Sequence, residues 1–330
     1  MDRLTAPISQ GEPCGPDLEY DADFLALEQA ARGKGEQQFG DTVVPAQEPD
    51  WRDVLERATA LLGRSKDLRV AVMLARACAR VEGLAGYVQA LQLIHLLCEQ
   101  YWAEAHPLLE TDDEHDPTVR MNALSVLAHP EAGLRDLKAA LLVRTRGGQA
   151  SIRDLEYALG LLSAPEGVSH PGETEIVAML ADDHASGGAA AATLGSAAKV
   201  ADDLQALLND KVGSDRSADL GPVRDLLRAG ARLAARVTGA ADAGTEEAAE
   251  GAASAGAAAP ITGDIRSRED ALRVLDRVCE FLERHEPTNP APLFIRRAQR
   301  LMGMNFVDII RDLVPDSVSQ LETLAGLNRE

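Results

Sequence analysis

Apolar residues recur at helical spacing along the first 145 residues of the chain. In the segment 50–63 the apolar stripe is Trp51, Val54, Leu55, Ala58, Leu61 and Leu62. Apolar positions three and four apart share one face of a helix, so this pattern predicts an amphipathic helix. Asp50 is the expected N-cap and Gly63 the expected stop. The same reasoning predicts further helices over 21–33, 65–83, 84–107, 116–130 and 133–143, with Ser65 and Asp116 as caps.

No segment shows the alternation of apolar and polar residues that is typical of a strand, so the pattern predicts an all-α fold. Residues 1–145 form the first predicted domain, a helical bundle. Residues 146–238 form a helical middle region, in which helices are expected near 151–162, 174–184, 197–213 and 219–239. The middle segments are short and rich in Ala and Gly, which predicts looser packing there.

Residues 239–260 contain no large apolar side chain, so they cannot bury enough surface to offset the cost of ordering. We interpret them as a flexible linker rich in Ala and Gly. Residues 261–330 return to helical periodicity and predict a small C-terminal helical domain. A module of this size is marginally stable alone, which favours self-association. The expected oligomerisation residues are Leu293, Phe294, Arg297, Leu301, Phe306, Ile309 and Ile310.

The basic side chains near Leu293 allow two interpretations. Arg296, Arg297 and Arg300 beside apolar anchors resemble the rim of a protein-binding helix. The alternative is an ordinary amphipathic helix with a solvated face, and periodicity by itself favours this second interpretation.

The formal net charge is -20 over 330 residues. This balance argues against nonspecific binding to nucleic acid, which depends on Lys and Arg, and against an anionic membrane surface. The chain has no run of about 18 apolar residues that would predict insertion into a membrane. Its four cysteines are scattered and the N-terminus has no apolar segment typical of a signal peptide. We therefore expect a cytoplasmic protein with free thiols that meets other proteins.

Candidate chemistry is sparse. Asp112, Asp113, Glu114, His115 and Asp116 form an acidic cluster that suggests a cation site, because hard metals take carboxylate ligands. The cluster lacks the glycine and the spaced ligands of a calcium loop, and acidic residues before a helix are favourable without any metal. A metal-dependent hydrolase that uses this cluster is one alternative function.

A weaker acidic cluster is Asp182, Asp183 and His184. The chain has no nucleophile elbow and no phosphate-binding glycine loop. We therefore expect no enzyme activity and no cofactor.

The stretch 36–58 interrupts the helical rhythm with two prolines and an apolar Val-Val pair, which predicts an extended, ordered loop before a helix. One interpretation is that its apolar residues cover the end of the bundle. The other is that the loop docks another protein. The residues of this candidate interaction site are Phe39, Asp41, Val43, Val44, Pro45, Gln47, Glu48, Pro49 and Trp51.

The first 145 residues resemble the TssA (ImpA N-terminal) family of bacterial type VI secretion. The resemblance is carried by Pro13, Cys14, Gly15, Asp17 and Leu18, then by 45–51, 65–84 and 101–128. The segment 267–316 is similar to the tail of short TssA proteins, and nothing resembles the added C-terminal domain of the long class.

This resemblance implies a non-enzymatic assembly protein on the cytosolic side of the inner membrane, at the secretion baseplate. It implies partners among the baseplate, sheath, inner-tube and membrane-complex proteins, and a ring-forming homo-oligomer. An adaptor that acts outside secretion is a second alternative function.

Overall fold

The computed structural model describes residues 2–33, 37–39, 42–45, 47–109, 116–165, 167, 169–238, 272, 274–276, 278–279, 284 and 290–302. The chain divides into two compact units, Met1–Gly251 and Ala252–Glu330. The described part is mainly helical, as expected. None of its helices combines the length and the apolarity that crossing a bilayer requires.

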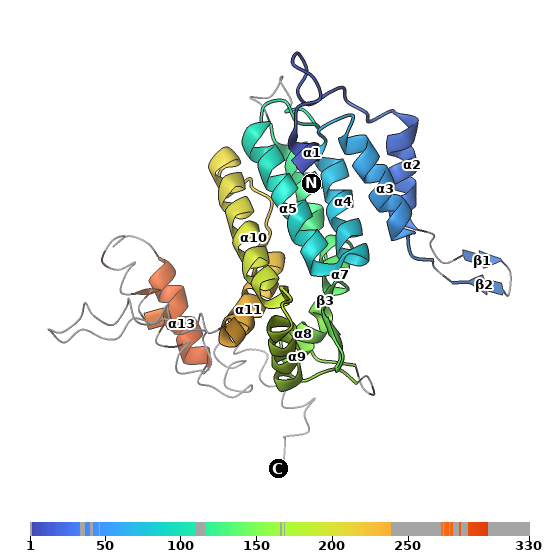
Figure 1. Ribbon diagram of the computed structural model, residues 1–330. Coiled ribbons are helices and arrows are strands. Elements are labelled where there is room, and N and C mark those ends of the chain that lie inside the picture. The colour runs from blue at the N-terminus through green and yellow to red at the C-terminus, as the bar shows by residue number, and fades with distance from the viewer. Residues whose placement is uncertain are drawn as a thin grey trace, which may run out of the picture. The chain divides into compact units, whose positions relative to one another are not determined.

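Two central helices organise the first unit. Helix α4 (Leu68–Val81) and helix α5 (Gly83–Gln100) lie side by side, and most of their side chains are buried (Figure 1). Helix α3 (Trp51–Leu62) packs on α4, and α2 (Ala22–Arg32) packs on α3. Asp50 caps α3 as predicted, because its side chain accepts the N–H groups of Arg52 and Asp53. Helix α4 is capped by Asp67, so the expectation of Ser65 as its cap is wrong.

Shorter elements surround these helices. The N-terminal α1 contacts α5, while α6, η1 and α7 contact α4. Their bounds are Asp2–Thr5 for α1, Thr118–Ser125 for α6, Val126–Ala128 for the 3-10 helix η1, and Gly133–Lys138 for α7.

The expectation of a purely helical fold is wrong at two hairpins. Strands β3 (Leu141–Thr145) and β4 (Gly148–Ser151) pair antiparallel, where a helix had been expected to continue to Val143. The Arg146-Gly147 turn joins them, and Gly148 has a φ of 148°, which glycine adopts readily. Strands β1 (Gln37–Phe39) and β2 (Thr42–Val44) form the second hairpin inside the stretch expected to be a loop.

The remaining helices of the first unit belong to the predicted middle region. Helix α10 packs against both α11 and α5, and α9 packs against α11 and β3 (Figure 1). The helices of this region are α8 (Ile152–Ala158), α9 (Glu173–Ala185), α10 (Ala190–Val212) and α11 (Gly221–Thr238).

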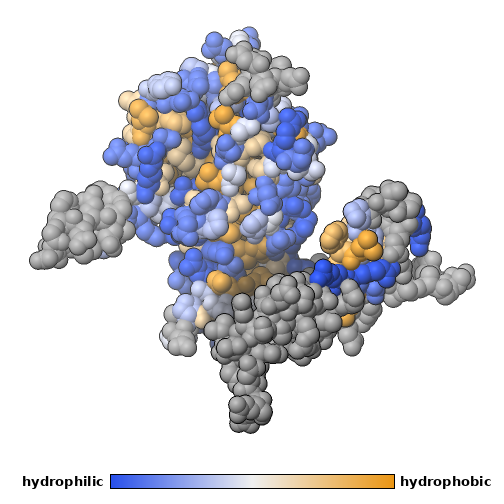
Figure 2. Space-filling model, turned by 180° about the vertical axis from the view of Figure 1, so that it is seen from behind, coloured by the Kyte–Doolittle hydropathy of each residue, from blue (hydrophilic) through white to orange (hydrophobic). Residues whose placement is uncertain are grey.

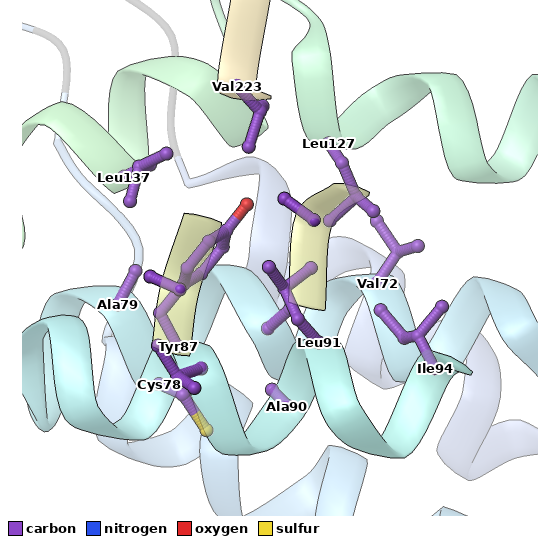
Figure 3. Packing of buried hydrophobic residues seen from close by; sticks show 14 of the residues in the cluster. Val72, Cys78, Ala79, Tyr87, Ala90, Leu91, Ile94, Leu127, Leu137 and Val223 are labelled. Atoms are coloured by element: carbon purple, nitrogen blue, oxygen red, sulfur yellow. The ribbon is translucent and has the colours of Figure 1, made fainter. Parts of the chain in front are cut away.

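The hydrophobic core is continuous between residues 1–145 and 146–238. Val223 of α11, Tyr87 of α5 and Leu137 of α7 belong to one buried hydrophobic cluster (Figure 3). Lys138 of α7 also forms an ion pair with the buried Glu156 of α8, at 2.7 Å. The boundary predicted at residue 145 falls at the turn of the β3–β4 hairpin, so the two predicted regions pack as one unit.

In the second unit, helix α13 (Ala291–Met302) contacts the preceding segment. The side-chain amide of Gln299 donates to the Leu272 carbonyl at 3.1 Å and to Asp276 at 2.9 Å. The thiol of Cys279 is buried and lies 3.9 Å from the Pro292 carbonyl. The predicted linker 239–260 lies outside the described residues.

Candidate functional site

The predicted interaction stretch ends at Trp51, the first residue of α3. Its side chain is only 8% exposed. The guanidinium carbons of Arg76 and Arg80, both on α4, lie 5.3 Å and 5.6 Å from the ring centroid. A cation over an aromatic face is attracted to the ring electrons. The ring of Trp51 therefore packs on the helical bundle.

Both arginines are also held by carboxylates. Arg80 forms an ion pair with Glu48, which precedes α3. The Nε of Arg76 donates to Asp136 of α7 at 2.8 Å. Burial raises the pKa of the Asp136 carboxyl above its ordinary value, and the charge of Arg76 opposes that shift. Glu48, Trp51 and Asp136 are thus joined through two neighbouring arginines, so the segment before α3 is anchored to α4 and α7.

The segment 34–46 lies between two residues, Gly33 and Gln47, whose backbones approach each other closely. Gly33 has a φ of 66°, and a Cβ at this position would lie 2.5 Å from the carbonyl oxygen of Gln47. Only glycine allows the two backbone segments to come this close. The β1–β2 hairpin lies within this segment, and the anchored Glu48 follows directly.

The predicted interaction residues fall into three groups. Pro45, Gln47 and Glu48 are exposed, and Pro49 is half-buried. The backbones of Phe39, Val43 and Val44 lie in the β1–β2 hairpin, in which Val43 pairs with Gln38. Asp41 lies outside the described residues. The structure thus presents three exposed residues, Pro45, Gln47 and Glu48, shortly before the buried Trp51.

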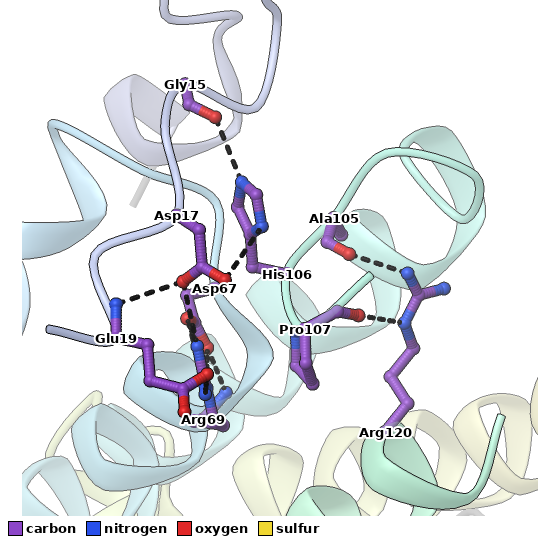
Figure 4. Close-up of polar contacts among 9 residues, drawn as sticks. All are labelled: Gly15, Asp17, Glu19, Asp67, Arg69, Ala105, His106, Pro107 and Arg120. Carbon is purple, nitrogen blue, oxygen red and sulfur yellow. Dashed lines mark hydrogen bonds and ion pairs between the residues drawn. The ribbon is translucent and has the colours of Figure 1, made fainter. Parts of the chain in front are cut away.

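A second polar cluster, which sequence reasoning missed, fixes the N-terminal segment (Figure 4). Arg69 lies 3.2 Å from Asp17, 2.9 Å from Glu19 and 2.7 Å from Asp67. His106 Nε2 lies within hydrogen-bonding distance of the Gly15 carbonyl, at 2.9 Å. Gly15 and His106 are 91 positions apart in the sequence. No local sequence pattern could therefore have identified the cluster.

The segment Cys14–Leu18 is thereby locked against the bundle. Cys14 and Leu18 are buried, and the Lys66 N–H donates to the Cys14 carbonyl at 2.7 Å. Arg120 is buried too, and it donates to the carbonyls of Trp102, Ala105 and Pro107, which holds the loop that carries His106. The conformation of this loop and of the N-terminal segment is therefore set by the same polar cluster.

Of the acidic cluster at 112–116, only Asp116 belongs to the described residues. Asp116 accepts hydrogen bonds from the N–H and hydroxyl groups of Thr118, at 3.2 Å and 2.8 Å, at the start of α6. Residues 112–115 lie outside the described part. Over the described ranges no three His, Cys, Asp or Glu side chains are arranged to hold an ion, and this includes Asp182, Asp183 and His184.

In the second unit the predicted oligomerisation residues are partly described. Leu293 and Phe294 are 74% and 69% exposed, and α13 shows an apolar patch beside strongly hydrophilic residues in Figure 2. Arg297 has interactions of its own. Leu301 lies in α13, while Phe306, Ile309 and Ile310 lie outside the described residues.

Three comparisons with known proteins show what this chain is similar to. The family model "ImpA, N-terminal, type VI secretion system" matches residues 5–129. The chain is 41% identical to the type VI secretion system component TssA1 of Pseudomonas aeruginosa strain PAO1, over 99% of this chain and 98% of that protein. The solved N-terminal domain of TssA from Burkholderia cenocepacia, which includes the conserved ImpA_N region, is 28% identical with a TM-score of 0.54. The match covers 72% of this chain and 93% of the solved domain.

A mainly helical unit with an ImpA-type N-terminal region defines a class of type VI secretion components. The chain belongs to the TssA family of this secretion system. Membership confirms the resemblance found in the sequence. It also favours a secretion component over the two alternatives, a metal-dependent hydrolase and an adaptor outside secretion.

Proposed function

We propose that this chain is a non-enzymatic assembly protein of a type VI secretion apparatus. It associates with the baseplate on the cytosolic side of the inner membrane. There it links the baseplate and the membrane complex to polymerisation of the sheath and inner tube. The observation that carries the proposal is the identity to a TssA1 protein along nearly the whole chain, which gives both units a counterpart in a secretion component.

In this proposal the first unit docks a secretion partner through Pro45–Glu48 and the β1–β2 hairpin. Two features support a docking role. Pro45, Gln47 and Glu48 are exposed, and the end of the segment is braced by the Glu48–Arg80 ion pair and the buried Trp51. A segment that lies between Pro45 and Pro49 and has a fixed base loses less conformational freedom on binding than a free loop does.

The C-terminal domain predicted over residues 261–330 is proposed to assemble copies of the chain into a ring. The exposed Leu293 and Phe294 of α13 support this role, because adjacent large apolar side chains are favourable to bury between subunits. A chain that ends near residue 240 is expected to be a monomer or a small dimer by light scattering, while the intact chain is a large oligomer. Equal masses for the two would contradict this assignment.

The function is tested in bacteria that lack this protein. We expect them to assemble few sheaths, visible with a fluorescent sheath subunit, and to secrete little inner-tube protein. The intact chain should restore both. Normal sheath assembly and secretion without the protein would refute the proposed function.

The docking segment is tested with Gln47→Ala combined with Glu48→Ala. Glu48 is exposed, so its ion pair contributes about 0–1 kcal/mol to stability and the double variant should remain folded. Binding to an isolated baseplate or sheath protein should weaken in a pull-down. Gln92→Ala with Glu99→Ala is the matched control, because both residues are exposed on α5. Normal binding and secretion by the Gln47 and Glu48 variant would leave the stretch as an ordered connection only.

A further inference from the structure

A cleft of about 600 Å³ lies between the tip of the β3–β4 hairpin and helix α9. It belongs entirely to the first unit and is separate from the Pro45–Trp51 segment. The hairpin contributes one wall, the segment before α9 contributes the end, and α9 contributes the other wall. Its lining includes Gly148, His170, Glu175, Ala178, Met179 and Asp182.

One face of α9 gives the cleft its chemical character. Glu175, Ala178, Met179 and Asp182 follow the spacing i, i+3, i+4 and i+7, so they lie along a single stripe of the helix. The two carboxylates flank the apolar pair and are separated by about 10 Å along the axis at 1.5 Å per residue. Both acidic residues are exposed. The stripe therefore combines an apolar floor with a negative charge at each end.

The hairpin tip leaves this floor uncovered because it carries two glycines. A Cβ at Gly148 would lie 3.8 Å from the sulfur of Met179. Any larger side chain directed the same way would occupy the space over the methionine. Gly148 also has a φ of 148°, a conformation that other residues rarely adopt. The open floor thus depends on glycine at this position.

No Lys or Arg side chain of the described residues lines this cleft, although the imidazole of His170 does. The Glu175 carboxylate accepts the Gly172 N–H at 2.8 Å, at the start of α9. Neither Glu175 nor Asp182 has a salt-bridge partner within the described ranges. Arg144 and Arg146 line a neighbouring cleft that shares Thr145 and Asp182, and Arg144 donates to the side chain of Gln149. The Glu175 end is accordingly the more negative end.

We propose that the cleft docks a segment of a partner protein through one arginine side chain. The aliphatic part of an arginine would pack on Met179 and Ala178, and its guanidinium would lie near Glu175, at the more negative end of the cleft. Arginine suits the site better than lysine, because its planar group offers several donors in fixed directions and loses hydration more readily. An acidic or purely apolar segment would leave the two carboxylates without a partner or place like charges together.

The proposal is tested by titrating the full chain with the blocked peptide acetyl-Gly-Ala-Arg-Ala-Gly-amide. The same peptide with citrulline is the control, since citrulline keeps the shape of arginine without its charge. The readout is the NMR signal of the Met179 methyl group in protein labelled at the methionine methyls, assigned with Met179→Leu. We expect the arginine peptide to shift this signal and the citrulline peptide to bind about tenfold more weakly or less.

Two variants make the result specific. Glu175→Gln with Asp182→Asn should raise the Kd of the arginine peptide about tenfold, and glutamine can still accept the Gly172 N–H. Asp210→Asn with Asp225→Asn makes the same change in net charge at exposed positions elsewhere and should leave the Kd within about twofold. Ala178→Leu should abolish the Met179 shift by filling the cleft, without any change in charge.

Three outcomes would overturn the proposal. They are equal binding of the arginine and citrulline peptides, an equal loss of affinity in the two double-charge variants, and a lower oligomer mass of the Glu175 and Asp182 variant by light scattering. The last result would assign the cleft to contacts between copies of this chain. Because the probes are peptides in solution, the result does not depend on the proposed role in secretion.

Discussion

Replacing Trp51 with alanine should destabilise the first unit strongly. The indole is 8% exposed and packs in the main hydrophobic core, and truncation of a buried Trp or Phe to alanine costs about 3–5 kcal/mol. Its two cation contacts with Arg76 and Arg80 add about 0.5–1 kcal/mol each. No compensating gain is expected, because the alanine leaves a cavity beneath two charged side chains.

The assay is urea unfolding of the full chain, followed by circular dichroism at the helical band. We expect the free energy of unfolding of the first unit to fall by about 4–7 kcal/mol in Trp51→Ala. Trp51→Phe is the control that separates volume from the aromatic face. It keeps a ring for the arginines and should lose about 1–2 kcal/mol. A loss below about 1 kcal/mol in Trp51→Ala would refute the conclusion that this ring braces the loop.

Three further predictions follow from the buried features of the first unit. Gly15→Ala should lower the free energy of unfolding, measured in urea, by about 2 kcal/mol or more. The reason is that Gly15 has a φ of 69° and a Cβ there would lie 2.3 Å from the Arg64 carbonyl oxygen. Gly11→Ala is the control and should be neutral, because the space around Gly11 is open. Arg120→Lys should cost about 2–4 kcal/mol in the same assay, because one ammonium group cannot match the fork that serves three carbonyls, whereas the exposed Arg52→Lys should not change the midpoint. Burial raises the pKa of Cys14 to about 11 and those of Cys78 and Cys98 to about 12, from 9.0. The thiols of the unfolded chain therefore ionise at a lower pH than the buried thiols of the folded protein. The contribution of these thiols to the free energy of unfolding is fully present below pH 9 and falls as the pH rises toward 12. Rapid reaction of these thiols with a disulfide reagent at pH 8 in the folded protein would contradict this prediction.

The helices were predictable where the signal is local. Asp50 and the stripe that starts at Trp51 identify α3 almost to the residue, because cap and periodicity both lie within the segment. Ser65 is a plausible cap by residue type, yet it is buried in the turn whose next residue bonds to Cys14. Asp67 caps α4 instead. The choice between two suitable residues was made by contacts distant in sequence.

The hairpin β3–β4 was missed for a similar reason. Leu141 to Val143 read equally well as the last turn of a helix, since a short apolar run fits both periods. Pairing with 148–151 and packing against α9 decide in favour of a strand. At the candidate site, the sequence identified Trp51 and the exposed residues before it. It did not identify Arg76, Arg80 or Asp136 as their support, because those residues come from other helices.

The close approach of Gly33 to Gln47 has a consequence for protein engineering and for divergence among relatives. A segment whose two ends meet can be exchanged for another of different length without moving the helices on either side, since closing a longer loop costs little extra free energy. Residues 34–46 are accordingly a natural place to graft a short epitope or half of a split reporter. Such an insertion would label the secretion component beside its proposed docking segment while Gly33, Glu48 and Trp51 keep the base unchanged.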